Sequence, residues 1–224
     1  MIKNLVRGLA ALSLTLAPLA VTTPAARAQA AEPTVLPIGA AVSALSLGTE
    51  SRDGYTRSAF RHWNAGANPG DGCNTRAEVL IAEAVTPPTV GARCKLTGGT
   101  WWSYYDGKTV TSASGLDIDH MVPLAEAWDS GASAWTAARR EAYANDLGQD
   151  ASLGAVTGSS NRSKSDQDPD EWLPSAPGAL CRYAAEWTAT KLRWDLAVDE
   201  LEKDRLLDIA AGCGGTPVTY TPAP

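Results

Sequence analysis

Two short segments of this 224-residue chain carry side chains that could together hydrolyse a phosphodiester. In the first, Asp119 stands directly before His120, and Asp117 lies two positions earlier; in the second, Asn161 offers an amide oxygen. A histidine with its ordinary pKa of about 6.5 can take a proton from water near neutral pH. A carboxylate and an amide oxygen suit a cation such as Mg²⁺, which prefers oxygen ligands. The two segments therefore predict one general base and one cation site.

Each of these residues also has an ordinary interpretation. An Asp-His pair is common on protein surfaces, and an asparagine at a helix start is often a cap. Adjacent side chains of a strand point to opposite faces, so Asp119 and His120 would not bind one ion together without strain. We therefore expect Asp119 and Asn161 to bind the cation and His120 to face the attacking water. The second histidine, His62, adjoins Trp63 and is expected to be structural.

The elements that must position these residues are predicted from local patterns. Residues 116–122 and 153–157 are expected to be strands, and a helix is expected to begin near Asn161. The dipeptide Asp106-Gly107 predicts a β-hairpin between residues 95–105 and 109–112. Further helices are expected over residues 38–47, 77–85, 124–128 and 136–143, the second of them capped by Asn74 or Thr75, although a strand is also possible there.

The C-terminal third predicts two helices. Tyr183, Trp187, Thr190 and Trp194 recur at steps of four, three and four, which places them on one helical face. This face is expected to be core rather than a platform for nucleobases. A second helix is expected over residues 198–211, ending at Gly212.

Four cysteines and the N-terminal residues indicate export. Residues 1–28 combine a basic start, an apolar run and small residues before a cleavage point, which is typical of a signal peptide. An even number of cysteines in an exported chain favours disulfides. Of the three possible pairings, Cys73–Cys94 and Cys181–Cys213 are favoured because each closes a local segment, the second by joining the two C-terminal helices.

The remaining chain suffices for one domain. We expect a flexible segment over residues 29–49, the domain over 50–213 and a flexible tail over 214–224, secreted and with no membrane attachment after cleavage. The formal charge of −6 becomes −9 without the three basic residues of the signal peptide. This is unfavourable for a nucleic-acid partner, so a local basic patch is expected at the site. The candidates for this patch are Arg139, Arg140, Arg162, Lys164 and Arg182.

These residues resemble a known nuclease motif. The run Asp117-x-Asp119-His120-x-Val122-Pro123, followed by a short strand and Asn161-Arg162-x-Lys164-Ser165-Asp166, resembles the ββα-metal (HNH) motif, as in the HNH domain of RNA-guided CRISPR nucleases. The wider context resembles secreted bacterial HNH endonucleases related to the C-terminal domain of GmrSD-type restriction enzymes. That context is formed by residues 72–76, 99–101, 105–107, 123–128 and 168–172. The resemblance covers roughly residues 50–213, and the motif itself covers 117–166.

The resemblance implies a fold and a set of roles. The fold would be α+β, with an HNH core, a preceding β-hairpin and a disulfide-tied C-terminal helical hairpin. Asp119 and Asn161 would bind one divalent cation, Mg²⁺ first and Mn²⁺ or Ca²⁺ as alternatives, and His120 would be the general base. Asp117 would support the strand end. Lys164 and Arg162 would contact phosphate, although solvated charges are an equally good interpretation of both.

Two features depart from that family pattern. The middle asparagine, which ties the loop together, would stand near the second strand, but Ser152 and Leu153 occupy that place and Asn145 has the wrong spacing. The 41 positions between His120 and Asn161 also form a long gap, filled by an inserted helical segment at residues 130–150.

The sequence therefore favours a secreted, monomeric, metal-dependent endonuclease that cleaves DNA with low sequence specificity, with RNA left open as a substrate. The alternative is a non-catalytic exported binding module on an HNH-like scaffold. A glycan hydrolase that uses Asp117 and Asp119 is a third hypothesis.

Overall fold

A computed structural model describes residues 32–224, so the expected signal peptide lies outside the described residues. The fold is mixed, with helices and small sheets. The helices are α1 Ile38–Ala44, α2 Thr75–Ala82, α3 Leu124–Asp129, α4 Ala137–Ala144, α5 Gly158–Lys164, α6 Ala179–Trp194 and α7 Glu200–Gly212. The strands are β1 Thr34–Pro37, β2 Thr89–Val90, β3 Leu96–Thr97, β4 Trp101–Ser103, β5 Lys108–Val110, β6 Leu116–His120, β7 Leu153–Thr157 and β8 Pro217–Tyr220.

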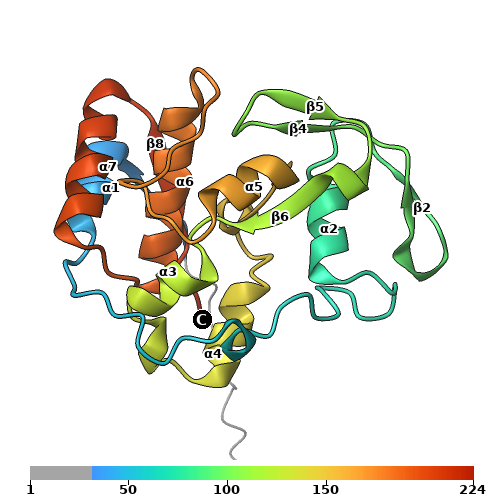
Figure 1. The fold of residues 1–224 in the computed structure, drawn as a ribbon, viewed down its shortest axis with the longest axis horizontal. Helices are drawn as coiled ribbons and strands as arrows, with labels where there is room; N and C mark the ends of the chain where they lie inside the picture. The colour runs from blue at the N-terminus through green and yellow to red at the C-terminus, as the bar shows by residue number, and fades with distance from the viewer. Residues whose placement is uncertain (1–31) are drawn as a thin grey trace, which may run out of the picture. The chain divides into compact units, whose positions relative to one another are not determined.

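The strands pair in twos, and every pair is antiparallel. The β6–β7 pair is central to the site, because β6 ends at His120 and α5 directly follows β7. Figure 1 shows β6 and α5 between a helical group of α1, α6 and α7 and a second group that contains α2, β2, β4 and β5. The predicted strand at 153–157 is confirmed, and the strand predicted over 116–122 is present but ends at His120. The hairpin that turns at Asp106-Gly107 is also confirmed, but its strands are shorter than predicted, because β3 pairs with β2 instead.

Alternation along β6 separates an apolar face from a polar one. Leu116 and Ile118 pack with the buried residues of α2 and with Trp101, whose indole donates to the Leu80 carbonyl. Asp117 and Asp119 leave β6 on the other face, where Asn161 and Lys164 of α5 contact their carboxylates. The hairpin therefore hides its apolar side and presents its carboxylates to the next helix.

The C-terminal helices form the larger core. Tyr183, Trp187 and Trp194 of α6 are buried, which confirms that this aromatic face is core. Cys181 near the start of α6 is bonded to Cys213 directly after α7, as the helical-hairpin prediction required. No helix of the described residues is long and apolar enough to cross a membrane.

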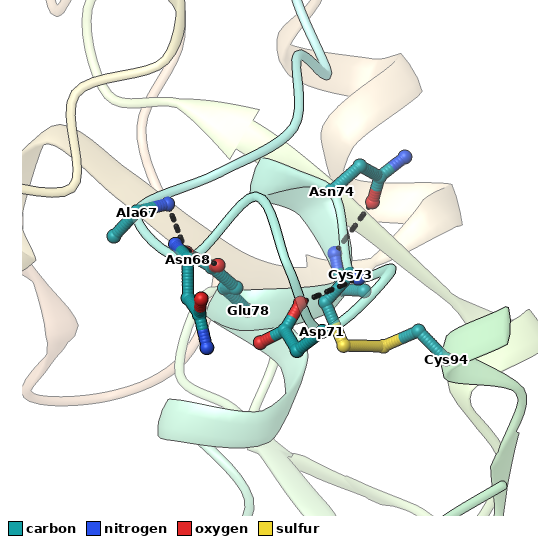
Figure 2. Close-up of a disulfide and its surroundings, with 8 residues drawn as sticks. Ala67, Asn68, Asp71, Cys73, Asn74, Glu78 and Cys94 are labelled. Atoms are coloured by element: carbon teal, nitrogen blue, oxygen red, sulfur yellow. Dashed lines mark hydrogen bonds between the residues drawn. A yellow bond between two sulfur atoms is a disulfide. The ribbon is translucent and has the colours of Figure 1, made fainter. Parts of the chain in front are cut away.

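The loop before α2 is held by the second disulfide and by carboxylates (Figure 2). Cys73 is bonded to Cys94, as predicted, and Asn74 caps α2 by accepting a hydrogen bond from the Ala77 amide. Glu78 of α2 accepts from the backbone of the same loop, 2.9 Å from the Ala67 nitrogen. Gly66 fits there because its φ is +70° and a Cβ would lie 2.4 Å from that carboxylate.

The prediction of flexible ends is wrong for two segments. β1 pairs with β8 from Thr34 opposite Tyr220 to Pro37 opposite Pro217. Beyond β8, the Ala223 amide donates to the Arg193 carbonyl of α6. Composition rich in Ala, Pro and Thr suggested loose ends, but each strand satisfies the backbone groups of the other. The domain therefore extends beyond residues 50–213 in both directions.

Candidate functional site

The end of β6 opens into a cavity of about 440 Å³. Asp119, His120 and Asn161 all line it, although 41 positions separate the last two in the sequence. Arg162 lines it as well. β7 runs antiparallel to β6, from Leu153 beside His120 to Thr157 beside Leu116, and α5 follows it. The helix then runs back along β6, so that Asn161 reaches Asp117 and Lys164 reaches Asp119.

His120 is held in one tautomer by its surroundings. Its Nε2 lies 3.0 Å from the Ala144 carbonyl oxygen, which can only accept, so the ring proton resides on Nε2. The ring stacks on Trp63 at 5.4 Å between centroids and lies nearly parallel to Tyr143 at 6.4 Å. Burial lowers the pKa of His120 to about 3, because the charged ring would lose its hydration. His120 is therefore a neutral imidazole whose Nδ1 lone pair is bonded to no described residue.

Asp119 is buried, and its two carboxylate oxygens differ. Oδ2 accepts from the Tyr105 hydroxyl at 2.6 Å and from the Lys164 ammonium at 2.5 Å. Oδ1 accepts no hydrogen bond from any residue of the described chain. Burial raises the pKa of Asp119, and the Lys164 charge opposes that rise. One oxygen is thus fixed and the other is left for a ligand in the cavity.

Asn161 is oriented in a similar way. Its Nδ2 donates to Oδ2 of Asp117 at 3.3 Å. The other polar atom of the amide, Oδ1, is therefore left available for a ligand. The helix that carries it starts earlier than predicted, because Thr157 caps α5 by accepting from the Ser160 amide. Asn161 is therefore the middle residue of α5 and is not its N-cap. Asp117 lies beside Asn161, where it orients the amide.

The residues present fit a divalent cation with few protein ligands. Asp119 Oδ1 and Asn161 Oδ1 would supply one carboxylate and one amide oxygen, and Mg²⁺ commonly keeps several waters beside such a pair. The cavity carries no cluster of three acidic or histidine ligands. Among the described residues, the one such cluster is Glu50, Glu126 and Glu202, which lies around the Lys191 ammonium.

The prediction that Lys164 contacts phosphate is wrong. Its side chain is 0% exposed, and its ammonium donates to Asp119, to the His120 carbonyl at 3.1 Å and to the Met121 carbonyl at 2.8 Å. Three acceptors use all three N–H groups. Lys164 therefore binds the strand end and has no proton left for a substrate.

The predicted basic patch does not form either. Arg139 lies over Trp135 and Trp194, and Arg182 lies over Tyr104 and pairs with Glu186. Arg140 donates three hydrogen bonds, one from Nε and two from Nη1, and all three go to backbone carbonyls. Arg162 alone of the five lines the cavity as an accessible cation, with 73% of its side chain exposed and Asp117 3.4 Å away.

Two residues that line one wall of the cavity were not predicted from the sequence. Tyr55 and Arg57 line it from the segment before α2, and Arg57 is exposed. Within the described chain, the Arg57 guanidinium forms no ion pair, whereas the nearby Arg52 is held by Asp129 and Asp166. The only signal in the sequence was a cluster of arginines over residues 52–61.

Asn145 ties together the segment before α2, the start of α2 and α4. Its Oδ1 accepts from the Asn64 amide and the Thr75 hydroxyl, both at 2.9 Å. Its Nδ2 donates to the carbonyls of Arg61 and Glu141, both at 2.8 Å. Asn145 follows directly after Ala144, the acceptor for His120.

A protein-family model matches the part of the chain that carries the site. The family model for GmrSD restriction endonucleases, C-terminal domain, matches residues 91–209, which include Asp119, His120 and Asn161. The chain belongs to this family. Membership in the GmrSD C-terminal family associates the chain with nuclease-related domains.

A relative from Arthroderma benhamiae is 39% identical over 199 residues, which cover 87% of this chain and 95% of the relative. That protein is described as an uncharacterized secreted protein. No solved structure matches the chain.

Proposed function

We propose that this protein is a secreted, metal-dependent endonuclease of the HNH type that hydrolyses phosphodiester bonds of DNA, and of RNA if the cavity admits it. One observation carries the proposal: Asp119, His120 and Asn161 line one cavity, and each has one polar atom that is left free by its partners. The antiparallel β6–β7 pair followed by α5 has the order of a ββα core.

The three residues have complementary chemistry. His120 Nδ1 would take the proton of the attacking water, while the Nε2 bond to Ala144 holds the ring in place. Asp119 and Asn161 would hold the divalent cation through their Oδ1 atoms. Such a cation, when bound, stabilises negative charge on the phosphate and on the leaving oxygen. Arg57 and Arg162 would hold the flanking phosphates at the mouth of the cavity.

Export is supported by two observations. The two disulfides, Cys73–Cys94 and Cys181–Cys213, are typical of an oxidising compartment. The relative from Arthroderma benhamiae is described as secreted.

The test is cleavage of plasmid DNA and of RNA by the mature protein with Mg²⁺ or Mn²⁺, compared with His120→Ala. His62→Ala is the matched control, because the His62 ring lies 6.1 Å from that of His120 but does not line the cavity. We expect a loss of at least 100-fold for His120→Ala, the size of a general-base contribution. His62→Ala should keep most of the activity. Equal cleavage by the wild type and His120→Ala would disprove the proposal.

A non-catalytic binding module is the second candidate, and one observation favours it. Asp119, the expected carboxylate ligand, is already paired with a buried ammonium. This candidate predicts that neither nucleic acid is cut with any divalent metal.

A further inference from the structure

In the part of the chain that the structure describes, Lys164 is one of two lysines whose side chains are fully buried, and its contacts converge on the predicted cation ligand. Its ammonium lies 2.5 Å from Asp119 Oδ2, and it also binds the carbonyls of His120 and Met121. The same ammonium therefore binds the side chain of Asp119 and the backbone of the next two residues. It fixes the end of β6 from α5.

Lys164 also connects the two expected ligands. It follows Asn161 by three positions on α5, a spacing that places both side chains on the same side of a helix. Asn161 reaches Asp117 from this side, and Lys164 reaches Asp119. A helix of seven residues is not stable alone, so these contacts hold α5 against the strand.

The charge of Lys164 acts against a second cation. Asp119 brings one negative charge into the cavity wall, and Lys164 brings one positive charge at hydrogen-bond distance. A divalent cation on the other oxygen of the same carboxylate would lie close to the ammonium in a buried, weakly screened place. The two cations would repel each other, and Asp117, the other carboxylate on this face of β6, is itself paired with Arg162.

We propose that the Lys164 ammonium is a resident counter-ion for Asp119, which holds the ligand set together before the divalent cation binds and makes that cation bind weakly until a substrate phosphate adds negative charge. The inference rests on the proposed function, because it takes Asp119 and Asn161 as the cation ligands. It predicts that cation and nucleic acid enter the site together.

Lys164→Met tests this, because it removes the charge and keeps much of the volume. Mn²⁺ is the probe, and its free concentration is followed by electron paramagnetic resonance. Without metal we expect the variant to unfold at a lower temperature than the wild type, since Asp119 becomes a buried and unpaired charge. We expect its Mn²⁺ affinity to rise at least tenfold and Mn²⁺ to raise its unfolding temperature more than that of the wild type.

Arg193→Met is the matched control. Arg193 is also a buried cation with one carboxylate partner, Asp146, at 2.7 Å, and it does not line the cavity. Loss of either cation should destabilise the fold, but Arg193→Met should leave the Mn²⁺ affinity unchanged. A merely structural lysine would give the same result in both variants.

The outcomes separate the two proposals. If Lys164→Met folds only with Mn²⁺, the metal replaces the ammonium, and the inference is supported. If the variant folds but binds Mn²⁺ no more tightly than the wild type, or folds neither with nor without Mn²⁺, the inference is overturned while wild-type cleavage still supports the nuclease. If the wild type binds no Mn²⁺ even with an uncleaved oligonucleotide present, the cation site of the proposed function itself fails.

Discussion

The imidazole of His120 should remain a base in acidic solution. Its pKa is lowered to about 3 by burial, and the charges of Arg57 and Lys164 act in the same direction. A divalent cation on Asp119 would also disfavour the protonated ring. The ring therefore stays neutral at pH values where an exposed histidine, with a pKa of about 6.5, would be mostly protonated.

We therefore expect kcat/KM for DNA cleavage at saturating Mn²⁺ to show no loss attributable to His120 between pH 7 and pH 5. The stability of the fold, unlike the activity, should depend on pH in this range. The unfolded chain binds a proton at His120 below pH 6.5 and the folded chain does not, so the free energy of unfolding should fall as the pH drops from 6.5 toward 3. Thermal unfolding of the wild type and His120→Asn over this range checks it. A parallel fall in both proteins would contradict the prediction.

At the scale of elements, the segment before α2 should control substrate capture. Arg57 lines the cavity, whereas Arg61, four positions later, is 80% exposed and lies 3.5 Å from Glu141. Arg57→Ala should weaken the binding of a labelled DNA duplex and lower the slope of log affinity against log salt by about 1, the loss of one phosphate contact. Fluorescence anisotropy in EDTA measures binding without cleavage.

The matched variant for this measurement is Arg61→Ala, which removes the same charge from the same segment. It should leave the salt slope nearly unchanged, because its guanidinium does not face the cavity. Equal effects of the two variants would mean that overall charge, and not a contact of Arg57, controls binding.

Helices and turns could be predicted from the sequence where the residues that determine them lie within one short segment. Asn74 caps α2 through the amide of Ala77, the third residue of the helix, and Asp106-Gly107 supplies the turn between β4 and β5. The step of four and three residues along α6 identified its buried face. Each of these signals acts over a few residues, so no tertiary information was needed.

The misassigned residues depend on partners far along the chain. Lys164 looked like a surface cation, but its acceptors lie 43 to 45 positions earlier. Asn145 looked misplaced, although it binds Arg61 and Asn64 more than 80 positions away. The pairing of β1 with β8 joins the two ends of the described chain. Composition and spacing do not encode such contacts, so the roles of Lys164 and Asn145 could not be predicted from the sequence.

For the molecule as a whole, four separate segments meet at one buried charge cluster. Lys191 of α6 donates to Glu126 of α3 at 2.8 Å and to Glu202 of α7 at 2.7 Å. Glu50, from the segment after α1, lies within 4.8 Å of both carboxylates. Burial raises the pKa of Glu50 to about 8 and that of Glu202 to about 7. One ammonium does not neutralise three carboxylates, so the folded protein retains protons here near neutral pH.

Alkaline solution should therefore destabilise the fold. Between the ordinary glutamate pKa of about 4.5 and the raised values, the folded state binds more protons than the unfolded state, so the free energy of unfolding falls as the pH rises through 7 and 8. Glu50→Gln removes one titrating charge, and at pH 9 we expect it to unfold several degrees above the wild type, with little difference near pH 5. Glu200→Gln, an exposed change on α7, serves as the control and should follow the wild type. Thermal unfolding by circular dichroism from pH 5 to 9 decides this, and an equal alkaline loss in all three proteins would show that the cluster does not set the pH dependence.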